Sequence, residues 1–109
     1  VRDGKLTLKR CVELMSENAA RVFGLFPRKG ILAVGADADL VVVDMNNVWK
    51  VSNGDLYTHA KAIGTMYNGM ELVGRPVHTI VRGRIVMRDR KVDASAQGWG
   101  KCLTPEWSR

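Results

Sequence analysis

The sequence has little of the material from which most catalytic and metal-binding sites are built. It contains two histidines, two cysteines and 6% aromatic residues in 109 positions. No HxH, HExxH or CxxC spacing is present, so no set of metal ligands can be assigned. No apolar run reaches about 18 residues, which argues against a membrane span. Cys11 and Cys102 lie far apart and no secretory leader is visible, so we expect no disulfide and a cytoplasmic protein.

Residues that could carry chemistry occur singly. His59 falls in an irregular stretch and His78 on a predicted strand, where each is expected to be a surface residue rather than a ligand. Asp37 and Asp39 stand two positions apart in a turn, where such carboxylates usually accept hydrogen bonds from backbone amides. No G-x-S-x-G elbow, G-x-G-x-x-G fingerprint or phosphate-binding loop occurs. The residues therefore predict no catalytic, cofactor-binding or metal-binding position in this chain.

The formal charge of +6 raises nucleic acid as a partner, but the basic residues are scattered and none alternates with aromatic ones. A solvated surface explains most of these charges, so no nucleic-acid function is expected. The sequence starts at Val1 with neither an initiator methionine nor a basic-then-apolar leader. We therefore expect the chain to be a piece of a longer protein.

Two short consecutive helices are predicted at 8–15 and 17–23. Thr7 can cap the first helix through its hydroxyl, Ser16 can cap the second, and Gly24 can end it. Apolar residues recur on one face of each helix at intervals of three and four. Helices this short are unstable alone, and the predicted strands come only afterwards. We therefore expect their apolar faces to be covered by polypeptide outside these residues.

Strands and irregular segments are predicted for the rest of the chain. The apolar run at 31–34 and the alternating residues at 48–51 indicate short strands. The β-branched run at 40–43 indicates a strand covered on both faces, and the polar residues at 44–47 indicate a turn after it. The segment at 52–76 is rich in glycine and is expected to be an irregular surface loop.

A β-hairpin is the clearest local signal, at 77–87, with Gly83 supplying the positive φ of its turn. The tail at 94–109 has no periodicity and is expected to be an extended arm. Trp99 and Trp107 are large apolar groups that are costly to leave in water. The arm is therefore expected to dock on another surface.

A long and specific pattern runs through SENAARVFGL at 16–25, FPRKG at 26–30 and VGADADLVVVD at 34–44. This pattern resembles the end of amidohydrolase-superfamily enzymes. PRKG, YNGMELVGRP at 67–76 and GWGK at 98–101 are similar to segments of the dihydropyrimidinase and hydantoinase branch. Asn68 stands where that branch often has glutamate and Ala19 where many relatives have proline, which blurs the subfamily more than the superfamily.

The resemblance implies an α+β piece of a larger enzyme. In this family a (β/α)8 TIM barrel carries the active site, and a β-sandwich is built from both ends of the chain. Residues 1–25 would be the last helical layer of the barrel. Residues 26–93 would be C-terminal strands of the sandwich, with the irregular loop at 52–76, and residues 94–109 an extended C-terminal arm across a subunit interface. A homo-oligomer, by resemblance a tetramer, is also implied.

The resemblance further implies a hydrolase that opens dihydropyrimidine or hydantoin rings. In the family, histidines, a carbamylated lysine and an aspartate hold two zinc ions, and these ligands precede the position of Val1. No catalytic, cofactor-binding or metal-ligating residue is therefore assigned to this chain. Three alternatives stay open. They are a non-catalytic dihydropyrimidinase-related assembly protein, an allantoinase or dihydroorotase relative, and a free-standing basic interaction domain.

Overall fold

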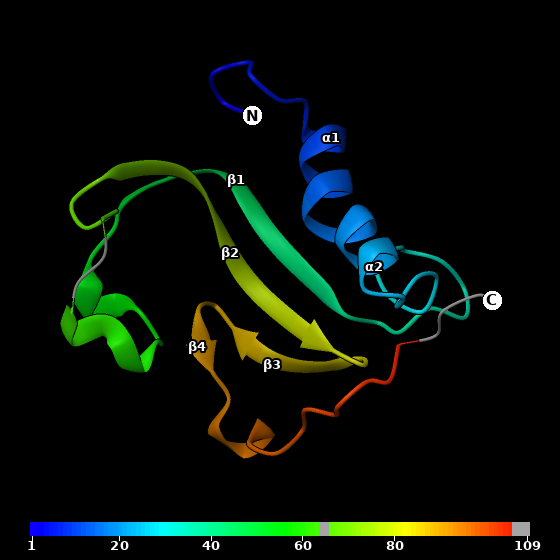
Figure 1. Ribbon diagram of the computed structural model, residues 1–109. Helices are drawn as coiled ribbons and strands as arrows, with labels where there is room; N and C mark the ends of the chain where they lie inside the picture. Colours follow the sequence, from blue (N-terminus) through cyan, green and yellow to red (C-terminus); the bar gives the residue numbers. More distant parts are fainter. Residues whose placement is uncertain (64–65, 106–109) are drawn as a thin grey trace.

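The structure is a computed structural model that describes residues 1–63 and 66–105. A helical segment comes first, and a four-stranded antiparallel sheet with the strand order β1-β2-β3-β4 follows. The elements in chain order are α1 (Leu8–Val12), η1 (Glu13–Glu17), α2 (Asn18–Val22), β1 (Leu40–Lys50), η2 (Asn53–Asp55), η3 (His59–Ile63), β2 (Glu71–Val81), β3 (Arg84–Arg88), β4 (Lys91–Val92) and η4 (Ala94–Ala96). The helical segment lies to one side of the sheet (Figure 1). The chain is thus an α+β piece, as expected.

The first three elements form one continuous helix rather than the two that were predicted. Thr7 caps the helix as expected, because its Oγ1 accepts a hydrogen bond from the backbone N–H of Arg10 at 3.1 Å. The second cap at Ser16 is wrong, since Ser16 lies inside the π-helical turn η1. The helix continues across the expected break because the Asn18 N–H donates to the Glu13 carbonyl. An ion pair between Glu17 and Arg21, one turn apart at 2.8 Å, supports the turn that follows.

Gly24 ends the helix as predicted. Its φ of +64° allows the left-handed conformation that turns the chain away from the helix axis. The Gly24 N–H donates to the carbonyl of Arg21 at 3.2 Å, and the Leu25 N–H donates to the carbonyl of Ala20 at 2.8 Å. This pair of hydrogen bonds is a Schellman motif, which satisfies carbonyls at the end of the helix.

The strand β1 runs without interruption through the predicted turn at 44–47. The pairing register with β2 shifts between Asp44 and Val48, so the extra residues form an irregular bulge in the strand. The Asp44 carboxylate accepts a hydrogen bond from the Asn46 N–H at 3.0 Å inside this bulge. The polar residues therefore distort the edge strand β1 instead of ending it.

The apolar run at 31–34 is not a strand, contrary to prediction. Gly30 and Gly35 bracket this run with φ values of +83° and +93°, so the chain turns at both of its ends. Leu32 is 83% exposed, and the run finds no strand partner within the described residues. Apolar character alone predicted a strand here, but the turns on either side remove it.

The irregular loop is shorter than predicted, because β2 begins at Glu71 and not after residue 76. Backbone hydrogen bonds prolong the β1–β2 pairing into the loop: Val51 N–H donates to Met70 O at 2.9 Å, and Gly69 N–H donates to Val51 O at 2.8 Å. The loop itself carries the short helices η2 and η3 and forms a lobe at one end of the β1–β2 ribbon (Figure 1).

The hairpin at 77–87 is confirmed, and it joins β2 to β3. Val81 pairs with Arg84 across a two-residue turn in which Arg82 and Gly83 both have positive φ, +46° and +78°. These values are typical of a type I′ turn, whose twist matches that of the strands. Sequence reasoning expected the positive φ at Gly83 and missed the one at Arg82.

The tail docks on this hairpin through Trp99. The indole N–H of Trp99 donates to the carbonyl of Val81 at 2.8 Å, and the guanidinium groups of Arg82 and Arg84 lie 4.8 and 5.3 Å from its ring centre. Docking was predicted for Trp99 and for Trp107; Trp107 lies outside the described residues.

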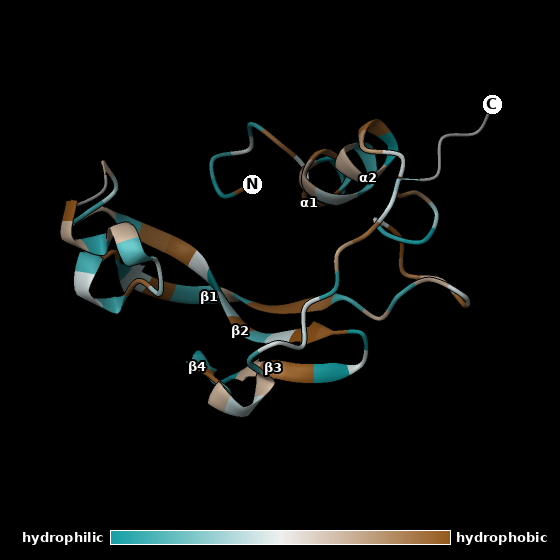
Figure 2. Ribbon diagram, turned by 60° about the horizontal axis from the view of Figure 1, so that its bottom comes forward, coloured by the Kyte–Doolittle hydropathy of each residue, from teal (hydrophilic) through white to brown (hydrophobic). Residues whose placement is uncertain are grey.

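Very little of the chain is buried. Among the residues that the structure describes, Ala20 and Val51 are the buried hydrophobic side chains. Met15 is 78% exposed and Val12 56%, so the strands that follow do not cover the helix, as predicted. Figure 2 shows helix and sheet lying apart, with hydrophobic segments in both. The expected cover on both faces of 40–43 is not provided by these residues, since Val41 and Val42 are 56% and 45% exposed.

Candidate functional site

A cluster of four charged side chains, which we name the charged clasp, gathers in the segment between the helix and β1. It consists of Arg28, Lys29, Asp37 and Asp39. The Arg28 Nε lies 3.0 Å from the Asp37 carboxylate, and the Lys29 Nζ lies 2.9 Å from the same carboxylate and also contacts Asp39. A backbone hydrogen bond from the Asp37 N–H to the Arg28 carbonyl at 3.0 Å brings the two halves of the clasp together.

The clasp shifts the pKa values of its members in the direction of mutual stabilisation. Hydrogen bonding from Lys29 and Arg28 holds the pKa of Asp37 below its ordinary value, against partial desolvation. Desolvation opposes ionisation of Asp39, but hydrogen bonds from Lys29 and from the Arg82 N–H still lower its pKa. Burial acts to lower the pKa of Lys29, and its two carboxylate partners outweigh this and raise it. All three groups are therefore held in their charged forms.

The clasp ties the loop to the sheet. Asp39 accepts a hydrogen bond from the backbone N–H of Arg82 at 2.7 Å, and the carbonyl of Ala38 accepts one from Gly83 at 3.0 Å. Both partners belong to the β2–β3 turn. The bond from Asp39 to a backbone amide agrees with the structural role predicted for this residue, whereas Asp37 bonds to side chains instead.

The same loop is packed against the helix at Gly30. A Cβ added to Gly30 would lie 2.6 Å from the Cβ of Ala20, 3.0 Å from the carbonyl oxygen of Ser16 and 3.1 Å from the Cα of Glu17. No side chain larger than hydrogen fits without movement of the backbone. The segment 26–39 is therefore the joint between helix and sheet, fixed by close packing on one side and by charge on the other.

A hollow of about 360 Å³ lies beside the clasp. Its lining includes Leu25, Phe26, Arg28, Val34 and Thr104, so the tail passes over the loop at this point. Among the described residues, the lining is mostly apolar and holds no carboxylate, thiol or imidazole. The described lining thus offers apolar surface for packing.

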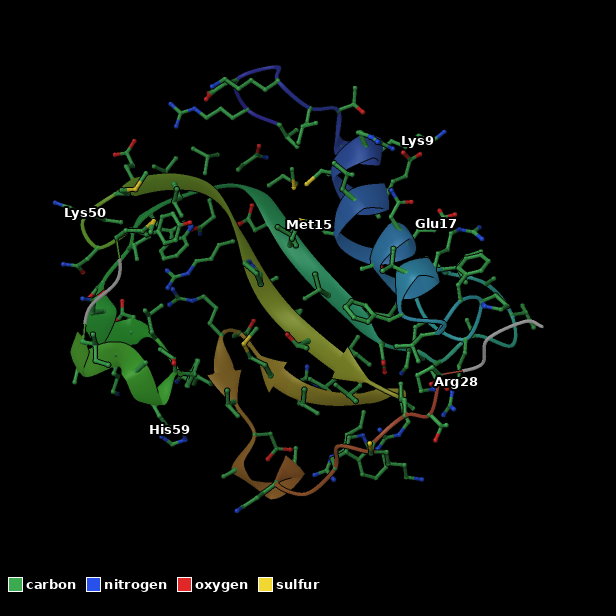
Figure 3. All side chains as sticks on the ribbon, viewed as in Figure 1. Lys9, Met15, Glu17, Arg28, Lys50 and His59 are labelled. Atoms are coloured by element: carbon green, nitrogen blue, oxygen red, sulfur yellow. The ribbon has the colours of Figure 1, made fainter. Side chains whose placement is uncertain are left out.

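The candidate ligands are dispersed. His59 is exposed on η3, away from the sheet, as Figure 3 shows. His78 Nδ1 accepts a hydrogen bond from the Asp89 N–H at 3.1 Å and so supports the turn between β3 and β4. Cys11 and Cys102 are free. In the parts of the chain that the structure describes, no three His, Cys, Asp or Glu side chains gather in a way that could hold a metal ion.

Sequence reasoning missed the basic half of the clasp. The sequence predicts a turn at Arg28 and Lys29, yet Arg28 binds Asp37 nine positions further on, and Lys29 binds Asp37 and Asp39, eight and ten positions further on. Opposite charges at either end of a loop were the available signal, but such a signal does not say which pairs meet.

In the described part of the chain, no helix has the length and apolar character to cross a membrane.

Known proteins share both the sequence and the fold of this chain. The pattern of the amidohydrolase family matches residues 1–86. The D-hydantoinase of Geobacillus stearothermophilus is 42% identical over 92 residues, which cover 84% of this chain and 19% of that protein. A dihydroorotase of Anaeromyxobacter dehalogenans is 46% identical over 93 residues, which cover 85% of this chain and 21% of that protein. The solved structure of a D-hydantoinase (dihydropyrimidinase) from Thermus sp. superposes with a TM-score of 0.82 at 41% identity. The superposition covers 92% of this chain and 21% of that protein.

The chain thus spans about a fifth of the length of these relatives. The matched pattern covers the helix, the joint, β1 and β2, and nearly all of the described fold finds its counterpart in the hydantoinase structure. The chain therefore belongs to the amidohydrolase family, and it is similar to one part of the known hydantoinases.

Proposed function

We propose that these residues form the C-terminal structural part of a zinc-dependent hydrolase that opens dihydropyrimidine or hydantoin rings. The observation that carries the proposal is the agreement with the Thermus sp. hydantoinase over 92% of this chain at a TM-score of 0.82. The 42% identity to the Geobacillus stearothermophilus D-hydantoinase supports the same activity class.

The zinc ions are proposed to bind to polypeptide other than these residues. The described side chains do not fit a zinc site, since His59 and His78 are far from forming a shared ligand set and no three donors converge. Asp37 and Asp39 are already bound to Lys29. The role proposed for this chain is therefore to support the fold around the catalytic centre.

The helix is proposed to be the last helical layer of a (β/α)8 barrel, and the sheet to be part of a β-sandwich. The divisions proposed are 1–25 for the helical layer, 26–93 for the strands and 94–109 for the arm. The exposed apolar side chains support this arrangement, because Val12, Met15 and Val41 are each more than half exposed and need cover. A cytoplasmic homotetramer is proposed on the family resemblance.

A dihydroorotase-type substrate is the second candidate. It is favoured by the 46% identity to the Anaeromyxobacter dehalogenans protein. The PRKG segment and the tail argue for hydantoin and dihydropyrimidine rings, but the groups that bind the substrate are proposed to lie outside this chain. The longer polypeptide that carries this segment, supplied with zinc, is expected to hydrolyse hydantoin or dihydrouracil. Hydrolysis of dihydroorotate alone would favour the second candidate.

A chimera tests the structural role directly. In this protein, named here the hydantoinase chimera, the matched segment of the Geobacillus D-hydantoinase is replaced by residues 1–109 of this chain. It is expected to be soluble, to retain zinc, and to hydrolyse hydantoin within about tenfold of the parent, a difference of about 1.4 kcal/mol in barrier height.

A matched pair of variants controls the chimera. Met15→Asp places a charge on the face proposed to be buried and is expected to abolish soluble, zinc-loaded enzyme. Lys9→Asp changes a side chain that is 88% exposed and is expected to have little effect. A chimera without zinc and activity, or one that tolerates both substitutions equally, would contradict the proposal.

A further inference from the structure

Two asparagine–glycine pairs lie in the lobe between β1 and β2, Asn53–Gly54 and Asn68–Gly69. Asparagine is among the chemically labile residues, and a following glycine exposes its backbone nitrogen because it has no side chain. The two pairs contact each other, since the Asn53 N–H donates to the amide oxygen of Asn68 at 3.0 Å. Their chemistry is alike, so any difference in reactivity must come from the fold.

The nitrogen of Gly69 is engaged in the sheet. It donates to the Val51 carbonyl at 2.8 Å, and the Val51 N–H donates to the Met70 carbonyl at 2.9 Å. Val51 is one of the buried residues of the chain, at 5% exposed. The Tyr67 carbonyl also accepts a hydrogen bond from Met70 at 2.9 Å across the turn. Freeing the Gly69 nitrogen therefore requires the end of the β1–β2 pairing to open.

The nitrogen of Gly54 has a different setting. Gly54 lies in the first turn of the three-residue helix η2, where N–H groups have no acceptor within the helix. A Cβ at Gly54 would meet the Ser52 hydroxyl at 3.6 Å and is otherwise unobstructed, and the residue is exposed. The hydrogen bonds that close η2 are 3.1 Å from Asp55 to Ser52 and 3.3 Å from Leu56 to Asn53. Such a short helix opens at little cost.

We propose that Asn53 is a site of spontaneous deamidation and that the fold protects Asn68. The Gly54 nitrogen attacks Cγ of Asn53; the new N–Cγ bond forms as the Cγ–Nδ2 bond breaks, and the amide group leaves as ammonia with the proton of the Gly54 nitrogen. Water then opens the resulting succinimide at either carbonyl and gives aspartate or isoaspartate. Water is the sole co-reactant, and nothing is oxidised or reduced. The product adds a negative charge beside Asp55 at the start of η2.

The test is peptide mapping by mass spectrometry after incubation of the folded, zinc-loaded hydantoinase chimera in mildly alkaline buffer. Asn53 is expected to convert roughly two- to tenfold faster than Asn68, the factor that the net strength of one hydrogen bond gives. In urea, which removes the fold, the two rates are expected to converge. Gly54→Ala should slow conversion at Asn53 and leave Asn68 unchanged.

Three results would overturn the proposal. Equal rates in buffer would show that the sheet does not protect Asn68, and a faster rate at Asn68 would reverse the assignment. A preference for Asn53 that persists in urea would show that the neighbouring sequence, rather than the fold, sets the rates.

Discussion

Replacing Gly30 by alanine is the sharpest single perturbation of the joint between helix and sheet. Its φ of +83° is unfavourable for a residue with a Cβ by about 1–2 kcal/mol. The added Cβ would also lie 2.6 Å from the Cβ of Ala20, and overpacking of this kind costs about 1–3 kcal/mol. The two effects together predict a loss of about 2–5 kcal/mol.

Two other glycines separate these effects. Gly35 has a φ of +93° but nothing within 4 Å of the added Cβ, so Gly35→Ala carries the backbone cost of about 1–2 kcal/mol alone. Gly54 has neither a positive φ nor a close neighbour, so Gly54→Ala is expected to be close to neutral. The urea midpoint of the hydantoinase chimera, followed by tryptophan fluorescence, is expected to fall in the order Gly54→Ala, Gly35→Ala, Gly30→Ala. Equal midpoints for the Gly30 and Gly35 variants would refute the packing of the loop on the helix.

Three further predictions concern the clasp and the tail, and each is read from the urea midpoint of the chimera. Lys29→Met should lower it more than Arg28→Met, because Lys29 binds both carboxylates and its side chain is 17% exposed against 46% for Arg28; equal losses would contradict the central place of Lys29. Asp37 and Asp39 have lowered pKa values in the folded state, so the unfolded chain binds more protons; their stabilisation is complete above the ordinary value of 3.8 and is lost as pH falls through the lowered values. The pKa of Lys29 is raised in the folded state, so its stabilisation is lost at the alkaline end, as pH rises above 10.5. Lys29→Met should therefore weaken the dependence of the urea midpoint on pH at both the acid and the alkaline end. Trp99→Ala should lower the free energy of unfolding by about 1–2 kcal/mol through the lost stacking and hydrogen bond, and it should speed trypsin cleavage of the tail. Trp99→Phe should give an intermediate effect. An unchanged cleavage rate would show that the tail is held elsewhere.

Local signals in the sequence predicted those features that neighbouring residues decide. The cap at Thr7, the stop at Gly24 and the hairpin turn at Gly83 all follow from side-chain chemistry and φ within a few positions. The break at Ser16 was wrong because a capping residue can also lie inside a helix, here between an Arg10–Glu13 ion pair and the Glu17–Arg21 ion pair.

Features that depend on distant partners could not be predicted in the same way. The polar residues at 44–47 indicate a turn, but pairing with β2 keeps them in a strand with a bulge. Nothing in the sequence around Lys29 indicates that it binds two carboxylates, those of Asp37 and Asp39. The dispersed histidines and the uncovered apolar face of the helix were both visible in the sequence, and they support the proposal of a structural role.

The central claim is that the apolar side of the helix is covered by polypeptide outside this chain. Figure 3 shows Met15 on the side of the helix opposite Lys9 and Glu17, and Met15 is 78% exposed. Alkylation of a Met15→Cys variant, quantified by peptide mapping, measures this cover directly, and Lys9→Cys serves as the control. The claim predicts rapid labelling of both positions in the isolated chain, and in the hydantoinase chimera rapid labelling at position 9 with strong protection at position 15. Equal labelling of the two positions in a folded, zinc-loaded chimera would contradict it.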